Sequence, residues 1–98
     1  DMLARVTSFK LKPNSREETV AIVDTIIPIV KNLDGMISIS ATYNDDTDSG
    51  VVTAIYRDQQ SMDAAAVASK ESFGLLGPLM TGPPEQEVHD IIMHVTGK

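Results

Sequence analysis

Cysteine and tryptophan are absent from this chain of 98 residues, and aromatic residues make up only 4% of it. Without cysteine the chain has no disulfide bond, no zinc–thiolate site and no redox-active thiol pair. Basic residues are also few, because eight Lys and Arg stand against fourteen Asp and Glu, and the net charge at pH 7 is −6. No run of basic residues offers the positive surface that nucleic acids and anionic membranes require. We therefore expect neither a nucleic acid nor a membrane among its partners.

Long apolar segments are missing as well. No segment approaches the roughly 20 apolar residues of a membrane-spanning helix, and no signal peptide is recognisable. With Met2 as the expected natural start, these absences predict a soluble, cytoplasmic protein. A chain of this length is expected to form one domain, here residues 2–98, and so small a domain buries only roughly 60–65% of its unfolded surface. Packing against a second copy would relieve that shortage.

Hydrophobic periodicity predicts the order strand, helix, hairpin, helix, strand. Alternating apolar residues predict strands at residues 2–11, 36–43, 51–56 and 88–95. Helical spacing predicts a first helix that begins with a Ser15–Glu18 capping box and a second helix that Ser61 caps and that runs to about Leu76. This order is that of the α+β, ferredoxin-like βαββαβ fold, in which a four-stranded antiparallel sheet carries both helices on one face.

The other face of the predicted sheet carries hydroxyl and apolar side chains rather than charges. Because an uncovered face of this kind is unfavourable in water, a second sheet packed against it is expected, which predicts a homodimer. The second helix has mostly small inner residues, such as Ala65, Ala66 and Ser69. Small residues let a helix approach the sheet closely, or they leave space for a ligand between the two layers.

Arg5 lies in the middle of the first predicted strand, where a charge is costly to bury unless it has a partner. Two roles are open to it. It forms an ion pair with a carboxylate at the sheet edge, or it lines a pocket and holds an anionic or phenolate oxygen. Tyr43 and Tyr56 end their strands, and each either hydrogen-bonds a ligand or packs as an ordinary amphipathic residue.

The acidic loop around Asp45, Asp46 and Asp48 does not match a calcium-binding EF-hand. Gly50 falls one position early, and Arg57 stands where a bidentate glutamate is required. A solvated hairpin tip is therefore the favoured interpretation.

The two histidines do not form a metal site in the predicted fold. His89 and His94 would point to opposite faces of a regular strand, and Asp90 lies roughly 13 Å from His94 along it. Each histidine is then either an ordinary half-buried strand residue or a group that transfers a proton. No phosphate loop, dinucleotide fingerprint or serine nucleophile motif occurs in the chain. We expect no metal and no cofactor.

Three segments, taken in their order and spacing, carry a resemblance to a known family: residues 4–13 (ARVTSFKLKP), residues 33–36 (LDGM) and residues 55–58 (IYRD) before a Ser-Met-Asp helix start. They resemble the antibiotic-biosynthesis-monooxygenase-like (ABM) family over nearly the whole chain. The resemblance implies a dimeric α+β barrel, in which two four-stranded sheets pack together and each subunit has a ligand cavity between its sheet and its helices.

Members of this family include cofactor-independent oxygenases of polyketide quinols, haem-degrading enzymes and proteins without known activity. The haem-degrading branch uses an asparagine on its first strand, and a tryptophan and a histidine on its second helix. Thr7 and Ala65 occupy the first two of these positions here, and the second helix has no histidine. The resemblance therefore does not extend to haem degradation.

Two functions remain open. The first is a small-molecule-binding protein, such as a cofactor-independent monooxygenase acting on an aromatic or polyketide-like compound held under the second helix. Such chemistry needs a dry pocket, orientation and a donor that stabilises an anion. The candidate residues are Arg5, Thr7, Tyr43, Tyr56, His89 and His94. The second is a structural or regulatory dimeric module without enzymatic activity. A pocket that Arg5 lines and that opens past Gly77–Pro78 would favour the first, and a cavity filled by side chains would favour the second.

Overall fold

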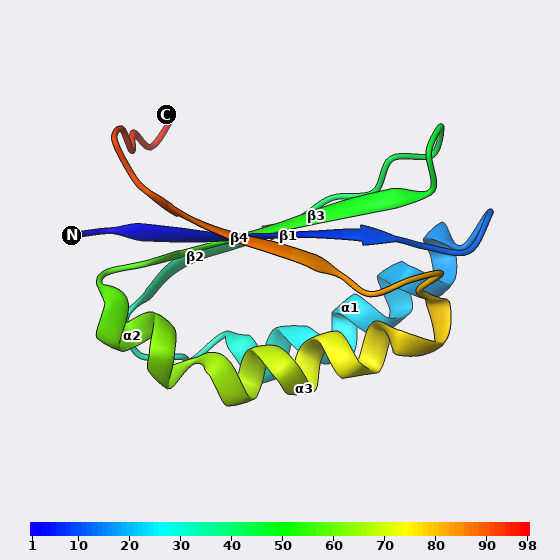
Figure 1. Cartoon of the computed structure of the whole chain (residues 1–98), viewed down its shortest axis with the longest axis horizontal. Coiled ribbons are helices and arrows are strands. Elements are labelled where there is room, and N and C mark those ends of the chain that lie inside the picture. The colour runs from blue at the N-terminus through cyan, green and yellow to red at the C-terminus, as the bar shows by residue number, and fades with distance from the viewer.

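The computed structural model of residues 1–98 has an antiparallel sheet with its helices on one face (Figure 1). In chain order the elements are β1 (Leu3–Lys10), α1 (Arg16–Val30), β2 (Met36–Ala41), β3 (Ser49–Tyr56), α2 (Gln59–Ala64), α3 (Ala66–Leu76), the 3₁₀ turn η1 (Gly77–Leu79) and β4 (Glu85–Asp90). The four strands lie in the order β2-β3-β1-β4, so the first and last strands are neighbours. The prediction of an α+β, ferredoxin-like βαββαβ fold is confirmed. None of the helices combines the length and the apolar character that crossing a bilayer needs.

The region predicted as one helix from Ser61 contains two helices. They are separated at Ala65, whose amide donates to the carbonyls of Ser61 and Met62 at 3.1 and 3.2 Å. Periodicity did not reveal this break, because alanine is a strong helix former and three alanines follow one another here.

The N-cap residue of α2 also differs from the predicted one. Asp58 has an extended backbone and its Oδ1 accepts from the Ser61 amide at 2.8 Å, so the prediction that Ser61 caps the helix is wrong.

The cap of Asp58 leads to a prediction about acid stability. Hydrogen bonding by Ser61 lowers the pKa of Asp58 below its ordinary value of 3.8. A group whose pKa is depressed by folding stabilises the native state above its unfolded pKa, and this contribution is lost as the pH falls through the folded value. An asparagine at this position would accept the same hydrogen bond without carrying a charge.

We therefore expect the Asp58→Asn variant to melt below wild type at pH 6 and to approach it at pH values below about 4. Thermal unfolding followed by circular dichroism between pH 2.5 and 7 measures this difference. Asp24→Asn, a substitution within α1 away from any helix cap, serves as the control. A melting difference between Asp58→Asn and wild type that stays constant across this range would contradict the assignment.

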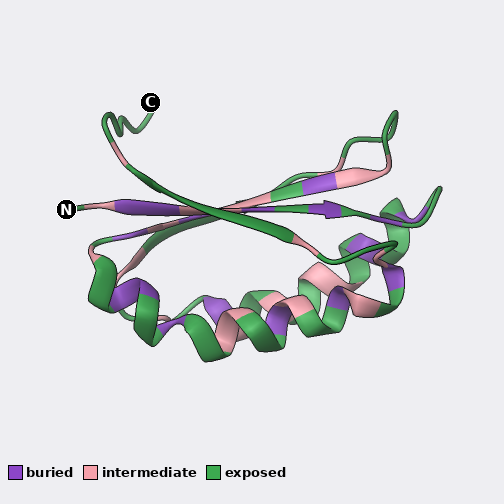
Figure 2. Ribbon diagram, in the orientation of Figure 1, coloured by how far each residue is buried: buried purple, intermediate pink, exposed green.

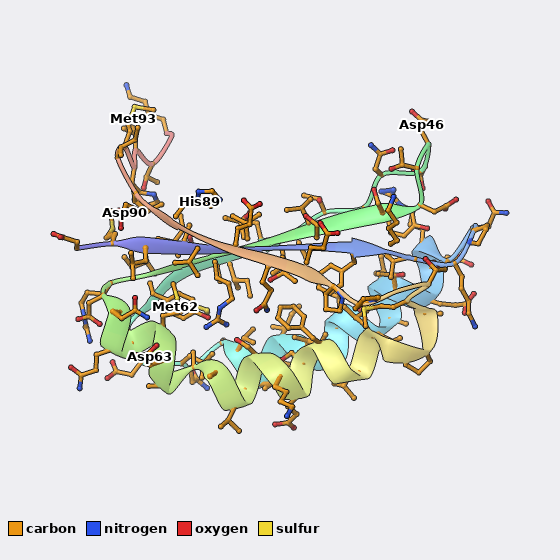
Figure 3. All side chains as sticks on the ribbon, viewed as in Figure 1. Asp46, Met62, Asp63, His89, Asp90 and Met93 are labelled. Atoms are coloured by element: carbon orange, nitrogen blue, oxygen red, sulfur yellow. The ribbon has the colours of Figure 1, made fainter.

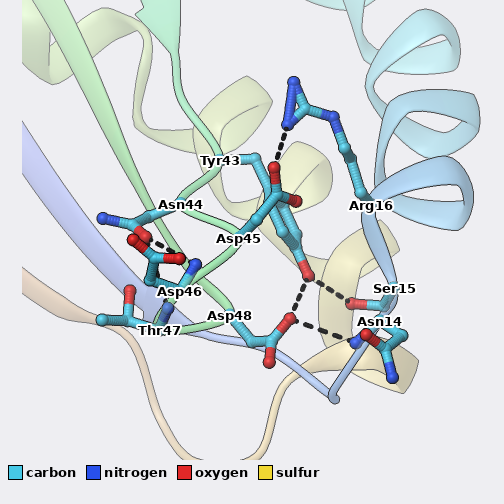
Figure 4. A network of polar contacts seen from close by, with 9 residues as sticks. All are labelled: Asn14, Ser15, Arg16, Tyr43, Asn44, Asp45, Asp46, Thr47 and Asp48. Atoms are coloured by element: carbon cyan, nitrogen blue, oxygen red, sulfur yellow. Dashed lines mark hydrogen bonds and ion pairs between the residues drawn. The ribbon is translucent and has the colours of Figure 1, made fainter.

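The start of α1 also differs from its prediction. Ser15 precedes the helix, but it makes no side-chain capping bond, so the Ser15–Glu18 capping box is wrong. Instead the buried Ser15 hydroxyl lies 3.3 Å from the hydroxyl of Tyr43, which donates to Asp48 at 2.8 Å (Figure 4). The serine hydroxyl connects the helix to the β2–β3 hairpin because the phenol of Tyr43 reaches it there.

Strand β4 begins three residues earlier than predicted, at Glu85, and it ends at Asp90. Its pairing with β1 runs from Glu85 opposite Ser8 to Asp90 opposite Leu3, the residue at which β1 begins. Beyond that point β1 offers no partner, so residues 91–98 leave the sheet on the side opposite the helices (Figure 1).

Because Ala4, Val6 and Ser8 face away from the helices, their β4 partners do so as well. These partners are Glu85, Glu87 and His89. The expectation of an open face without charges is therefore wrong for β4.

Most of the buried hydrophobic residues form two separate clusters between the sheet and the helices. Figure 2 shows buried residues in both layers. One cluster contains Leu3, Ala54, Tyr56, Met62 and Ala65. The other contains Phe9, Leu11, Leu76 and Leu79, with the ring of Phe73 5.2 Å from that of Phe9. Only 17 of the 98 residues are buried, so one chain has a thin core for its length.

Candidate functional site

A cavity of about 280 Å³ lies between the sheet and helices α1 and α3. It is lined by 14 residues, 11 of them hydrophobic, and the lining joins the two core clusters. Its apolar walls include Ile26, Val30, Val52, Ala54, Phe73 and Leu76. Small side chains face one another across it, from Ala41 and Ala54 on the sheet and from Ser69 and Ser72 on α3. Because these side chains are short, they do not fill the space between the sheet and α3.

Arg5 is the only charged residue in the lining of this cavity. Its Nη1 donates to the hydroxyl of Ser69 at 2.6 Å, and its Nη2 donates to the carbonyl of Met62 at 3.2 Å. The Met62 carbonyl lies at the break between α2 and α3, where it also accepts from the Ala65 amide, so it has two donors. The guanidinium carbon also lies 5.4 Å from the centroid of the Tyr56 ring, a cation–π distance.

Both acceptors of Arg5 are neutral, and the residue takes part in none of the ion pairs of the structure. Of the two roles predicted for it, the ion pair with a carboxylate is therefore wrong, and Arg5 lines the pocket. A guanidinium has five N–H donors, so three remain for another acceptor. A half-buried cation with free donors beside an apolar space is suited to an anionic or phenolate oxygen.

The structure brings only part of the predicted site together. Tyr56 is 1% exposed and lines the cavity beside Arg5. Thr7 is also 1% exposed and faces the helices, between Val52 of β3 and Gln86 of β4 in the strand register. Its hydroxyl has no hydrogen-bond partner, but Thr7 does not belong to the lining of the cavity.

Three predicted residues lie away from the cavity. Tyr43 belongs to the hairpin network with Ser15 and Asp48. His89 lies on the open face of β4, where its Nε2 is 2.9 Å from a carboxylate oxygen of Glu87 (Figure 3). His94 lies in the exposed segment after β4, so the expectation that it shares a strand with His89 is wrong.

The acidic hairpin uses its oxygens within the protein. Asp45 pairs with Arg16 at 2.9 Å, and Asp48 accepts from Tyr43 and from the amide of Asn14 at 3.1 Å (Figure 4). Asn44 accepts from the amides of the two residues that follow Asp45 in the turn. This arrangement is that of a hairpin tip whose polar groups stabilise the turn and anchor it to the start of α1.

The cavity meets one part of the criterion for a binding function, because Arg5 lines it, but not the other, because neither Gly77 nor Pro78 does. Two lining residues, Ile27 of α1 and Ile39 of β2, are 50% and 38% exposed. The cavity therefore reaches the surface along the edge between α1 and β2. The sequence did not identify Ser72 or the apolar residues of α1 as lining residues of the cavity. The apolar spacing of a helix is the same whether it packs against a core or against a cavity.

The ferredoxin-like fold and the apolar cavity beside Arg5 place this chain in the class of small-molecule-binding α+β domains. The family model described as antibiotic biosynthesis monooxygenase (ABM) matches residues 2–68, which is more than half of the chain. The chain therefore belongs to the ABM family, and the resemblance found in the sequence is confirmed.

Solved structures with the same fold agree with this membership. SnoaB from Streptomyces nogalater, described as a cofactor-independent oxygenase, has a TM-score of 0.79 and 16% identity, with 99% of each chain covered. A protein of unknown function from Nitrosomonas europaea has a TM-score of 0.82 and 14% identity, with 99% of this chain and 95% of that one covered. Rv0793 from Mycobacterium tuberculosis has a TM-score of 0.77 and 20% identity, with 98% and 100% covered. Identities this low establish the fold alone. No curated protein sequence matches the chain significantly.

Proposed function

We propose that this protein binds a small aromatic phenol, quinol or anthrone in the cavity and acts on it as a cofactor-independent monooxygenase. The observation that carries the proposal is the apolar cavity with the unpaired guanidinium of Arg5 in its wall. Apolar walls hold an aromatic ring and exclude water, and a guanidinium remains charged at every pH the protein meets. It therefore stabilises the ionised form of a bound phenol or enol.

The chemistry follows from that ionisation. Loss of a proton from an anthrone gives an electron-rich anion that can reduce molecular oxygen. The ring methylene becomes a carbonyl that contains one oxygen atom of O₂, and the other oxygen leaves as water with the two hydrogens of the methylene. No external reductant is required, because the substrate supplies the electrons. The part proposed for the protein is orientation, exclusion of water and stabilisation of the anion by Arg5.

The size of the cavity limits the ligand. Ligand pockets usually measure roughly 300–1,000 Å³, so about 280 Å³ fits a compact molecule of a few fused rings. A purely structural module would not need this space, because protein interiors pack with few voids larger than a water molecule. The unfilled cavity therefore supports a binding function over a structural one.

The proposed assembly is a homodimer formed through the open faces of two sheets. The helices all cover the same face of the sheet (Figure 1). The strand register puts Val6, Val51 and Ile55 on the other face. The segment after β4 lies on this side too, and its Ile92, Met93 and Val95 are 98%, 79% and 79% exposed. A second copy would cover these apolar side chains and supply the burial that one thin core lacks.

The proposed site is tested by filling it. Ala41 lines the cavity from the edge strand β2 and is exposed, so a larger side chain there can occupy the cavity without displacing buried atoms. We expect Ala41→Phe to bind 2-naphthol about tenfold more weakly than wild type by calorimetric titration, and to consume oxygen more slowly with an anthrone. Ala21→Phe, on the exposed side of α1, is the matched control.

Two outcomes of this experiment count against the proposal. Equal affinity for 2-naphthol in wild type and Ala41→Phe would show that the ligand binds outside the cavity. Binding of quinols and anthrones by wild type without any oxygen uptake would exclude the monooxygenase activity and leave a binding module.

A further inference from the structure

A second pocket adjoins the cavity on the other side of Arg5. It measures about 440 Å³ and lies between α3 and β4. Arg5, Ser69 and Phe73 line both this outer pocket and the inner cavity, so the two spaces meet at these residues. The residues that belong to the outer pocket alone are Ala66, Lys70, Pro84 and Gln86. Eleven of the 14 residues that line the inner cavity are hydrophobic, against two of the seven that line the outer pocket.

The charges of the outer pocket are of one sign. Arg5 and Lys70 line it and no acidic residue does, although the chain as a whole has a net charge of −6. Neither cation takes part in an ion pair, and the acceptors of Arg5 are a hydroxyl and a backbone carbonyl. The amide of Gln86 adds a neutral group that can donate to an anion. The pocket thus gathers donors and positive charge without an internal counter-ion.

We propose that the outer pocket binds the carboxylate of an aromatic acid whose ring system occupies the inner cavity. This inference rests on the proposed function and narrows its ligands from phenols in general to phenols that carry an acidic substituent. Arg5 would exchange the neutral hydroxyl of Ser69 for the carboxylate, because hydrogen bonds between two charged groups are roughly twice as strong as neutral ones. Lys70 supplies a second positive charge, and its side chain is otherwise free in solvent.

A matched pair of ligands tests this assignment. 3-Hydroxy-2-naphthoate and its carboxamide have nearly the same shape, and both carry the hydroxyl beside the acid or amide group, so that Arg5 can reach both groups. At pH 7 only the carboxylate form is charged. We expect wild type to bind the carboxylate about fivefold or more tightly than the amide, and Lys70→Gln to reduce that preference about threefold to fivefold without changing amide affinity. Lys70→Arg should keep the preference, and higher salt should weaken it, because the pocket is open to solvent. Lys12→Gln removes the same charge at a distant exposed position and should behave as wild type.

The outcomes separate this inference from the proposed function. If wild type binds the amide and the carboxylate with equal affinity, the outer pocket is not an anion site. The same conclusion follows if Lys70→Gln and Lys12→Gln have equal effects. Either result leaves aromatic binding in the inner cavity intact. If wild type binds none of the three ligands (the carboxylate, the amide and 2-naphthol), the proposed function is wrong and this inference is wrong with it.

Discussion

In the Arg5→Leu variant, bound 4-nitrophenol is expected to ionise at a pKa at least about one unit higher than in wild type. In wild type the guanidinium lies in the cavity wall with free donors and no carboxylate partner. An opposite charge favours the ionised ligand and lowers the pKa of its phenol, whereas an apolar cavity without the charge raises it. One pKa unit corresponds to a tenfold change in the relative affinity for the ionised and neutral forms. Wild type should therefore bind nitrophenol more tightly as the pH rises through the ligand's pKa, and Arg5→Leu should not.

The absorbance of nitrophenolate gives this bound pKa directly, between about pH 5 and 9. Arg5→Gln keeps a polar side chain with two N–H donors but has no charge, so it separates the effect of the charge from that of a hydrogen-bond donor. Arg16→Leu removes an arginine that pairs with Asp45 outside the cavity, and it should leave the bound pKa unchanged. The same ligand pKa in wild type, Arg5→Gln and Arg5→Leu would remove Arg5 from the binding site.

Replacing Val6 by glutamate is expected to dissociate the proposed homodimer. Val6 lies on the open face of β1, directly opposite Glu87 of β4. The new carboxylate would be placed beside an existing one and buried in the dimer interface. An uncompensated buried charge costs about 3–5 kcal/mol, and a symmetric dimer would contain two of them. The dissociation constant should therefore rise by more than about a hundredfold.

Sedimentation velocity over a range of protein concentrations measures this effect. We expect a dimer for wild type and a monomer for Val6→Glu at micromolar concentration. Val67→Glu makes the same change on the outer side of α3, where the valine is 79% exposed, and it should remain dimeric. A wild-type protein that sediments as a monomer at all concentrations would contradict the assembly.

The order of elements could be predicted from sequence because it depends on local patterns. Alternation in residues 2–11 placed Arg5 and Phe9 on the same face of β1, and the structure has both on the helix side. Alternation also works because each residue from Leu3 to Ser8 has a fixed partner in β3 and in β4. The face of β1 that Arg5 shares with Phe9 thus followed from alternation, whereas its role did not.

The features that failed depend on contacts between distant segments. The end of β4 at Asp90 is set by where β1 begins, and the serine at the start of α1 bonds Tyr43, which follows it by 28 residues. Both Asp58 and Ser61 are common N-cap residues, and only the backbone geometry chooses between them.

The cavity is a feature of the same kind. Its volume depends on Ala41, Ala54, Ser69 and Ser72, which are contributed by two strands and one helix. Any one of them is an ordinary core or surface residue when read alone. Arg5 was the exception, since it lies in its strand beside the apolar Leu3 and Phe9, where a buried charge requires a partner or a ligand. It was therefore the most informative residue of the candidate site.

A crystal structure of the protein with 2-naphthol bound tests the central claim most directly. The account predicts the naphthol rings between the sheet and helices α1 and α3, in contact with Val52 and Phe73, with the ligand oxygen within hydrogen-bonding distance of the Arg5 guanidinium. Naphthol bound at any other surface, with side chains closed over an empty or collapsed cavity, would contradict it.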